Sequence, residues 1–345
     1  MRSLADGLGA LLAAAVDAEA GEDLSALGHP LVAVDVADAP AIRRASADLR
    51  TGAPILVGVD RPGQTPEGLA DAFDILLTTA HNPPRPWVQA DRLDGALAGL
   101  RATVARAPVA SAVFVTVLRL GDQLDFEGAL AVESLAYSTL LAGEEFRAWR
   151  TGRPARARPT SAAPRVRTTR DNDRLVITLD RPESRNAIGA ATRDELTDAL
   201  RLARLDPSIT AVELRGAGAV FSAGGDLDEF GRAGDLALAH IIRNQRSPAR
   251  LTRELGSRLT VFIQGAAIGG GIEIAAAAAR IVADADAVFR LPEVTMGLIP
   301  GAGGTASLPP RIGRHRTAFM GLSGLDIPAD LALAWGLVNH LAPVP

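Results

Sequence analysis

The sequence predicts an α/β fold in which short strands alternate with longer helices. Short runs of β-branched residues recur along the chain, which is typical of strands. Between these runs lie Ala-rich stretches with the residue spacing of helices. The 345 residues are 48% hydrophobic, which fits one large or two modest domains.

The N-terminal region, residues 1–150, predicts an α/β part followed by a helical part. Strands are expected over residues 31–36 and 55–59, and helices over 91–149. The apolar stretch 8–16 is too short to span a bilayer, so we expect an Ala-rich amphipathic helix there rather than a signal sequence. Because no other long apolar segment lacks charge, we expect a cytoplasmic protein with no membrane partner.

The composition changes sharply at residues 151–170, where Arg, Pro, Ser and Thr replace the apolar pattern. This stretch predicts a linker, and residues 171–345 then form a second unit. In that unit the pattern predicts a helix over 190–203. Strands are predicted over residues 174–179, 211–215, 259–264 and 287–291.

Composition excludes several classes of chemistry. The 36 basic residues, all arginine, are balanced by 40 acidic residues, so nucleic acid is not an expected partner. The absence of lysine excludes Schiff-base catalysis, and the absence of cysteine excludes disulfides and thiolate nucleophiles. None of the five histidines has the spacing of a metal-binding helix face, so we expect no metal and no redox cofactor.

Two glycine-rich segments in the second half break the local pattern. FSAGGDL (221–227) follows a strand, and GAAIGGGIEIA (265–275) joins a strand to a helix. The consecutive Gly269, Gly270 and Gly271 expose backbone N–H groups near a helix N-terminus, which suits a developing negative oxygen. Close packing of strand on helix explains the triplet equally well at this stage.

Two glutamates strengthen the functional interpretation. Glu273 follows the glycine triplet within the apolar run IEIAAAAA, where a carboxyl group is expensive to bury unless it is paired or active. Glu293 follows a predicted strand in LPEVTMGLIPGAGGT. Two carboxyl groups in one apolar pocket can divide the acid and base roles. Taken alone, however, Glu293 is better explained as a surface residue at a strand end.

These segments belong to a set of five motifs that follow one another between residues 174 and 341. They are RPESRNAIG (181–189), FSAGGDL (221–227), GAAIGGGIEIA (265–275), LPEVTMGLIPGAGGTASLP (291–309) and ALAWGLVNHL (332–341). In this order and spacing they resemble the crotonase, or enoyl-CoA hydratase/isomerase, superfamily. The resemblance implies a crotonase-like spiral of ββα units, an acyl-CoA site, and a homo-oligomer, trimer or hexamer.

The resemblance also implies roles for individual residues. The N–H groups of Gly225 and Gly270 match the two donors that hold the thioester oxygen as an enolate forms, and Glu273 and Glu293 match the two glutamates of the hydratases. Positions that match the acyl-CoA path are Arg185, Ala187, Ala223, Gly224, Asp226, Leu227, Ile268, Pro292 and Leu298. We expect Asp226 to cap the following helix rather than to touch substrate.

The chain departs from the family at two places. Asp228 stands where hydratases often have a lysine near the CoA phosphate, so Arg185 or Arg232 is expected to bind that phosphate. Residues 96–154 resemble the helical tail that family members carry after the core. We therefore interpret the N-terminal half as a degenerate second crotonase unit whose helices, 91–150, cover the active site. An unrelated accessory domain is the alternative.

The expected function is hydration of a trans-2-enoyl-CoA, with coenzyme A carried by the substrate and no other cofactor. Other crotonase chemistry is the nearest alternative: isomerisation, acyl-CoA hydrolysis or arylacetyl-CoA dioxygenation. A non-catalytic acyl-CoA-binding subunit is the alternative outside enzymes. Several further residues are expected to be structural: His240 and Asn244 on a solvated helix face, Glu133, Glu144 and Glu145 as helix-surface or helix-start charges, and Trp87, Trp149 and Trp335 as core or interface anchors.

Overall fold

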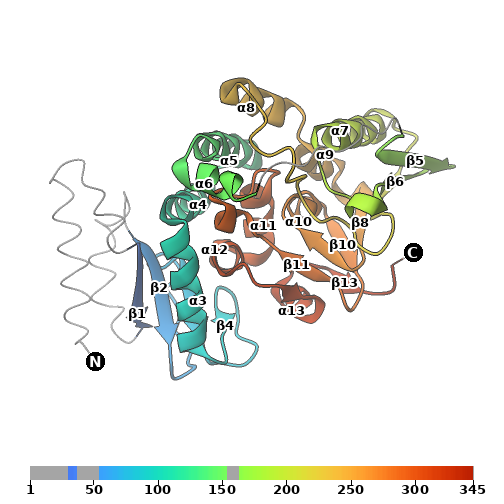
Figure 1. Ribbon diagram of the computed structural model, residues 1–345. Coiled ribbons are helices and arrows are strands. Elements are labelled where there is room, and N and C mark those ends of the chain that lie inside the picture. The colour runs from blue at the N-terminus through green and yellow to red at the C-terminus, as the bar shows by residue number, and fades with distance from the viewer. Residues whose placement is uncertain (1–29, 37–53, 154–162, 345) are drawn as a thin grey trace.

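The computed structural model describes residues 30–36, 54–153 and 163–344 (Figure 1). The predicted helix at residues 8–16 and part of the predicted linker lie outside these ranges. The described residues form three sheets and the helices packed between and around them, which is a mixed α/β fold.

The largest sheet occupies the C-terminal half and has the strand order β13-β10-β8-β7-β6-β5. Its strands are β5 Val166–Asp171, β6 Arg174–Leu179, β7 Ala211–Gly216, β8 Leu259–Ile263, β10 Arg280–Ala283 and β13 His340–Leu341. All neighbours run parallel except β5, which pairs antiparallel with β6 at the edge. In β6, alternate residues are buried, as expected for a strand with one face on the core.

A second sheet of three short strands lies beside the first. It consists of β12 Ile327–Pro328, β11 Val288–Arg290 and β9 Ala266–Ile268, in that order. Strands β8 and β10 belong to the six-stranded sheet. The strands that follow each of them in the chain, β9 and β11, belong to the three-stranded sheet. This repeat places the segments that follow β9 and β11 close together.

Seven helices of the C-terminal half pack around these sheets in the described residues. They are α7 Ala190–Leu205, α8 Leu236–Gln245, α9 Pro248–Leu255, α10 Gly270–Ala276, α11 Gly304–Ile312, α12 Arg314–Ser323 and α13 Ala329–Trp335. Helix α10 is buried along its whole length, so its side chains face other protein groups rather than bulk solvent.

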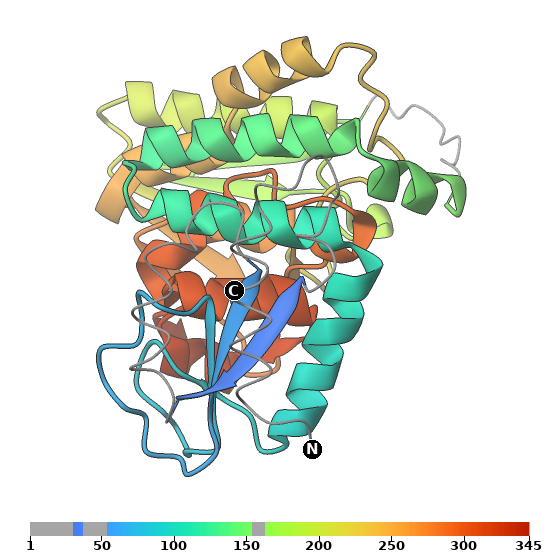
Figure 2. The ribbon, with the colours of Figure 1, turned by 90° about the vertical axis from the view of Figure 1, so that its left-hand side faces the viewer.

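In its described residues, the N-terminal half contains a four-stranded parallel sheet, ordered β1-β2-β3-β4, and four helices (Figure 2). The strands are β1 Leu31–Asp35, β2 Ile55–Asp60, β3 Ile75–Thr78 and β4 Val88–Gln89. The helices are α3 Leu93–Arg106, α4 Pro108–Gly121, α5 Phe126–Leu141 and α6 Glu144–Thr151. No described helix alone has the length and apolarity to cross a membrane. Helices α3 and α4 meet these two criteria only when taken together, and they are bent by 109° relative to each other.

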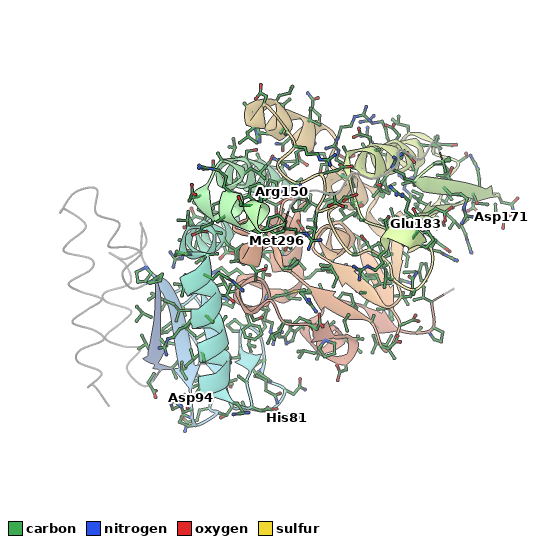
Figure 3. The ribbon with its side chains drawn as sticks, viewed as in Figure 1. His81, Asp94, Arg150, Asp171, Glu183 and Met296 are labelled. Carbon is green, nitrogen blue, oxygen red and sulfur yellow. The ribbon has the colours of Figure 1, made fainter. Side chains whose placement is uncertain are left out.

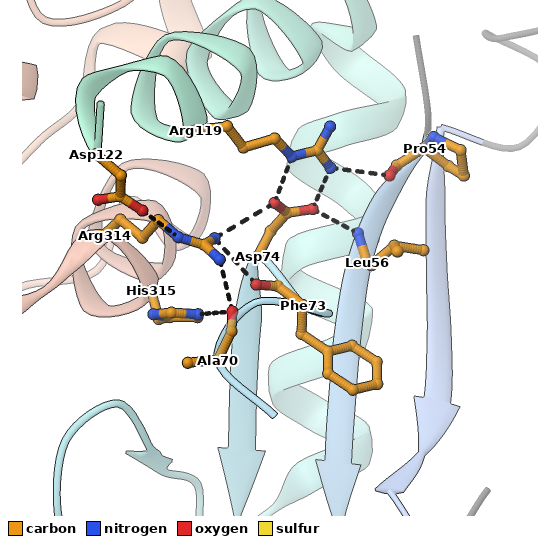
Figure 4. A network of polar contacts seen from close by, with 9 residues as sticks. All are labelled: Pro54, Leu56, Ala70, Phe73, Asp74, Arg119, Asp122, Arg314 and His315. Atoms are coloured by element: carbon orange, nitrogen blue, oxygen red, sulfur yellow. Dashed lines mark hydrogen bonds and ion pairs between the residues drawn. The ribbon is translucent and has the colours of Figure 1, made fainter. Parts of the chain in front are cut away.

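The two halves share one hydrophobic core, which includes residues of α3, α4 and β2 together with those of the C-terminal sheets. A buried ionic network also joins them (Figure 4). Asp74, which follows the loop before β3, binds Arg119 of α4 at 2.5 Å and lies 3.8 Å from Arg314 of α12. Nη2 of Arg314 and Nε2 of His315 also contact the Ala70 carbonyl, at 2.5 Å and 2.7 Å.

The predicted strands in the described residues are confirmed to within one or two residues at each end, and so are the helices predicted over 91–149 and 190–203. The predicted linker extends too far, because β5 already occupies its last residues. Five of the six side chains of β5 are exposed, and most are polar or charged, as is common on edge strands. The composition of that strand therefore resembles a linker.

Candidate active site

A cavity of about 650 Å³ lies between α5, α8 and the glycine-rich segments of the C-terminal half. Gly225, Gly270, Glu273 and Glu293, the four residues expected to act on substrate, all border it. The fold therefore brings together groups that the sequence separates by many residues.

The glycine triplet enters the cavity at the start of α10. The N–H of Gly270 begins the helix, and within the described ranges neither this N–H nor that of Gly225 has a hydrogen-bond partner. A Cβ on Gly270 would lie 3.7 Å from the Gly225 nitrogen, so the two unpaired amides are neighbours. Two adjacent free N–H groups in a cavity can both donate to one oxygen, as an oxyanion hole requires.

The other two glycines of the triplet serve close packing. Gly269 has φ of +47°, and a Cβ there would collide with Oε1 of Glu293. A Cβ on Gly271 would lie 2.9 Å from that of Ser222. The functional and the packing interpretations of the triplet therefore apply to different residues. Gly270 presents a hydrogen-bond donor to the cavity, whereas Gly269 and Gly271 allow close packing against Glu293 and Ser222.

Glu273 lies in the first turn of α10 and is 1% exposed. Its Oε2 accepts hydrogen bonds from Ala302 N at 2.7 Å and Gly304 N at 3.0 Å. Burial, and secondly the neighbouring Glu293, raise the pKa of this carboxyl. The two amide donors oppose that shift and favour the ionised form.

Glu293 opens a short 3-10 turn, Glu293–Met296, directly after β11, and is 7% exposed. Its Oε2 is buried and has no partner among the described residues. Burial raises the pKa of this carboxyl, and the nearby Glu133 adds to the effect. An unpartnered buried oxygen costs free energy, which indicates that it is satisfied by a bound molecule or carries a proton for one.

Glu133 is a third carboxyl at the cavity, and its expected place on a helix surface is wrong. It is 2% exposed, and Oε1 accepts from Gly303 N at 2.7 Å. Oε2 accepts from both N and Oγ1 of Thr305, each at 2.7 Å. Burial, with a smaller contribution from Glu273, raises the pKa of Glu133 to about 8. The signal was available: Glu133 stands alone in the apolar run ALAVESLA, as Glu273 does in its own run.

The loop from Gly301 to Thr305, which includes the first two residues of α11, donates backbone hydrogen bonds to two carboxyl groups. Alternate amides turn to opposite sides, so Ala302 and Gly304 donate to Glu273 while Gly303 and Thr305 donate to Glu133. Gly303 has φ of +112°, a value that favours glycine. Helix α5 of the N-terminal half thus fixes the same loop that orients Glu273.

Two further residues that the sequence analysis missed form another part of the cavity wall. Tyr137, the chain's one tyrosine, packs its ring against Gly301, where a Cβ would lie 2.5 Å from Cδ2 of the ring. The guanidinium of Arg243 in α8 lies 4.6 Å from the centre of that ring. Neither belongs to a motif, so only the packing of α5 on α8 reveals them.

Comparison with known proteins identifies the family of the C-terminal half. The family described as "Enoyl-CoA hydratase/isomerase" matches residues 170–345, about half of the chain. The chain belongs to the enoyl-CoA hydratase/isomerase family. The matched residues contain all four of the glycine and glutamate residues discussed above.

Several members of the family are similar to this chain over that half. The 2,3-dehydroadipyl-CoA hydratase of Escherichia coli is 37% identical over 169 residues, 49% of this chain and 66% of the relative. The mevalonyl-coenzyme A hydratase of Beauveria bassiana is 35% identical over 177 residues, 49% of this chain and 63% of the relative. This chain thus spans just under two thirds of these curated relatives' length.

Among solved structures, the enoyl-CoA hydratase from Thermoplasma volcanium is 32% identical in sequence, with a TM-score of 0.48. That likeness covers 52% of this chain and 72% of the solved chain.

The residues expected along an acyl-CoA path differ in their relation to the cavity. Asp226 borders the cavity, but it does not cap the following helix as expected. Its Oδ1 accepts from Asp228 N at 3.1 Å within a turn. Helix α8 begins later, at Leu236, and Asp235 caps it by accepting from Ala237 N at 2.9 Å. The turn residues between Asp226 and Asp235 separate the motif from the helix.

The remaining path residues lie around the cavity rather than on its wall. Arg185 is exposed, and its carbonyl accepts from Ala223 N at 2.8 Å, while Ile188 N donates to Gly224 O at 2.8 Å. These bonds hold the segment RPESRNAIG alongside FSAGGDL. Residues outside the cavity wall are Arg185, Ala187, Ala223, Gly224, Leu227, Ile268, Pro292 and Leu298. Leu298 is fully buried in the core.

Asp228 is buried and does not face the cavity, so its charge is not placed to repel a phosphate there. Arg150, labelled in Figure 3, lies near the end of α6. It donates to the carbonyls of Leu227 at 2.7 Å and Asp228 at 3.2 Å. Arg232 is exposed and borders the cavity.

Of the two residues expected on a solvated helix face, His240 contacts α5 and Asn244 lies at the cavity. Nδ1 of His240 lies 3.0 Å from Ser134 Oγ, and Asn244 borders the cavity.

Proposed function

We propose that this chain catalyses the addition of water to a trans-2-enoyl-CoA thioester. The observation that carries the proposal is one cavity bordered by two adjacent unpaired amides and two buried carboxyl groups with raised pKa values. Relatives named as hydratases of acyl-CoA compounds support this choice within the family.

In the proposed reaction the N–H groups of Gly225 and Gly270 bind the thioester oxygen. The oxygen of water forms a bond to C3 of the acyl group, and the electron pair of the double bond moves through C2 onto the thioester oxygen. The resulting enolate is stabilised by the two amides. The enolate then collapses as C2 takes a proton, which completes the addition of H and OH.

The two glutamates divide the proton transfers according to their hydrogen bonds. Glu273 accepts from two amides, which favours the carboxylate, so it takes a proton from the attacking water. Glu293 has no donor at Oε2, which favours the protonated acid, so it delivers the proton to C2. Glu133 acts on the other side of the loop and positions Glu273 through it.

The proposal also covers the coenzyme A site, the oligomeric state and the origin of the N-terminal half. Coenzyme A arrives with the substrate and passes Asp226, the mapped position that borders the cavity, with Arg232 or Arg185 at a phosphate. We also propose a trimer or hexamer in the cytoplasm, a spiral of ββα units in the core, and an N-terminal half that is a degenerate second unit.

The test follows loss of conjugated-enoyl absorbance with a panel of trans-2-enoyl-CoA thioesters. Wild type is expected to turn over at least one of them, and Glu273→Gln and Glu293→Gln to lower kcat by about 10²-fold or more. Glu254→Gln, on exposed α9 surface, is the matched control and should keep full activity. A wild-type chain that binds acyl-CoA but never consumes the double bond would overturn hydration in favour of isomerase, hydrolase, dioxygenase or pure binding.

A further inference from the structure

We propose that Arg243 binds a carboxylate at the far end of the substrate's acyl group, so that the preferred substrate is an enoyl-CoA derived from a dicarboxylic acid. The inference rests on the proposed function and adds the substrate class. It is carried by the way Arg243 is held, by the donors it leaves free, and by its place relative to the reacting groups.

One arm of the guanidinium is fixed by α5. Nη1 of Arg243 donates to Ser134 O at 3.1 Å, Ser134 Oγ at 2.8 Å and Ser138 Oγ at 3.1 Å. The plane of the group lies against the Tyr137 ring, 4.6 Å from its centre. These contacts hold the side chain in one orientation, so little conformational entropy remains to be lost when a ligand binds.

The other donors of Arg243 have no partner. Among the described residues, neither Nε nor Nη2 makes a hydrogen bond, and no carboxylate lies within 4.0 Å of the guanidinium. Neither Nε nor Nη2 is fully buried, so solvent or a ligand reaches these two atoms. Two parallel donors on one edge of a guanidinium match the two oxygens of a carboxylate.

The charges around this group leave it positive. The groups that act on Arg243 electrostatically are Tyr137, Glu133 and Arg193. Glu133 directs both of its oxygens to the loop amides and does not pair with Arg243. Arg193, which also borders the cavity, is a second cation there, and its own ion pair is with Asp194 at 2.8 Å. A half-buried guanidinium without a counter-ion costs desolvation free energy that a bound anion offsets.

Its position favours an acyl carboxylate over a CoA phosphate. Arg243 stacks on Tyr137, whose ring packs on Gly301, next to the amide of Ala302 that holds Glu273. The guanidinium is therefore one aromatic ring and one loop away from the reacting end of the substrate. The CoA phosphates lie beyond the whole pantetheine arm. The cavity wall also contains apolar side chains suited to methylene groups: Leu130, Leu141, Ile188, Ile242 and Ile274.

The experiment compares trans-2-hexenedioyl-CoA, which ends in a carboxylate, with trans-2-hexenoyl-CoA, which has the same chain length and no charge. Wild type is expected to prefer the charged substrate in kcat/KM. Arg243→Met should lower kcat/KM for the charged substrate by about 10- to 100-fold, mainly through KM, and leave the uncharged one within about threefold. Arg243→Lys, which keeps charge but not the paired donors, should fall between.

Binding of the non-reacting adipoyl-CoA and hexanoyl-CoA, measured by calorimetry, separates this inference from the proposed reaction. If no enoyl-CoA is hydrated but Arg243→Met selectively weakens adipoyl-CoA, the reaction is wrong and the anion site stands. If Arg243→Met weakens adipoyl-CoA, hexanoyl-CoA and free CoA equally, the anion is a CoA phosphate and the inference is wrong. Equal affinity of wild type for both acyl-CoAs also overturns it. Arg253→Met is the control, because Arg253 lies 5.2 Å from the Phe126 ring outside the cavity.

Discussion

Glu133 and Glu273 hold one short loop from opposite sides, and their roles differ although both are buried carboxyl groups. Glu273 borders the cavity with a partner carboxyl, Glu293, whose Oε2 is free. Glu133 has three donors on its two oxygens. Glu133, with hydrogen-bond donors on both oxygens, is suited to positioning the loop. Glu293, with a free oxygen, is suited to proton transfer.

Glu133→Gln tests the positioning role. The amide NH2 cannot accept from the N–H and hydroxyl of Thr305, so at least one buried donor is left unpaired. We expect the free energy of unfolding to fall by about 1–3 kcal/mol and kcat to fall by about tenfold with little change in KM. Urea unfolding and steady-state kinetics measure both.

Glu127→Gln, on the exposed face of the same helix, is the control and should change stability by less than about 0.5 kcal/mol. A Glu133→Gln protein as stable and as active as wild type would show that the loop does not depend on this carboxyl.

The three buried carboxyl groups also predict how stability varies with pH. Their pKa values are raised in the folded chain, that of Glu133 from 4.5 to about 8, so the folded state binds more protons than the unfolded state between these values. The free energy of unfolding should therefore be highest near or below pH 4.5, as far as these groups are concerned, and fall as pH rises toward 8. Each group contributes a slope of up to about 1.4 kcal/mol per pH unit.

Urea unfolding at pH 5, 6, 7 and 8 measures that slope for wild type, Glu133→Gln, Glu273→Gln and Glu293→Gln. Each substitution should flatten the curve. An unchanged slope in all three variants would contradict the raised pKa values.

At the scale of elements, Gly269, between β9 and α10, combines a positive φ with a close approach to the side chain of Glu293. Gly269→Ala places a Cβ in a strained conformation and against Glu293 Oε1. We expect a loss of about 2–4 kcal/mol in the free energy of unfolding and a lower kcat, because Glu293 must move.

Gly256→Ala is a matched control. Gly256 has φ of +56°, similar to that of Gly269, but a Cβ there has nothing within 4 Å. It should lose about 1 kcal/mol from backbone strain and keep full activity. If the two alanine variants have the same free energy of unfolding and the same kcat, the contact between Gly269 and Glu293 contributes neither to stability nor to activity.

The elements that the sequence predicts well are those whose side-chain pattern reports burial directly. The continuous apolar run of β2 and the alternating run of β6 are visible without a structure. Strand β5 is not, because its exposed Arg and Thr side chains carry no apolar pattern. Gly270 and Glu273 drew attention because glycine and glutamate are out of place in apolar runs, whereas the roles of Gly225 and Glu293 came from the resemblance of their motifs to the family. Tyr137 and Arg243 were not, because ordinary helix residues gain meaning only when α5 and α8 pack together.

At the scale of the whole molecule, the N-terminal half contributes wall residues to the cavity and shares a core with the C-terminal half. The network around Asp74 is one of the polar junctions between them (Figure 4). The side chain of Asp74 is 4% exposed, so removing its charge leaves Arg119 and Arg314 without their shared partner.

Asp74→Asn should therefore destabilise the whole chain by about 3 kcal/mol while leaving kcat nearly unchanged under conditions where the variant is folded. Thermal unfolding followed by circular dichroism should show one transition at a lower Tm. Asp94→Asn removes the exposed pair with Arg61 and should have almost no effect. A normal Tm in Asp74→Asn would show that the network does not hold the halves together.

Hydration is tested by the mass of the product that wild type forms from a trans-2-enoyl-CoA in D2O. The expected product is heavier than the substrate by one D2O, with one deuterium retained on carbon at C2 after return to H2O. A product with exchanged hydrogen but no added water, or release of free CoA, would contradict hydration and assign the cavity to another reaction of the family.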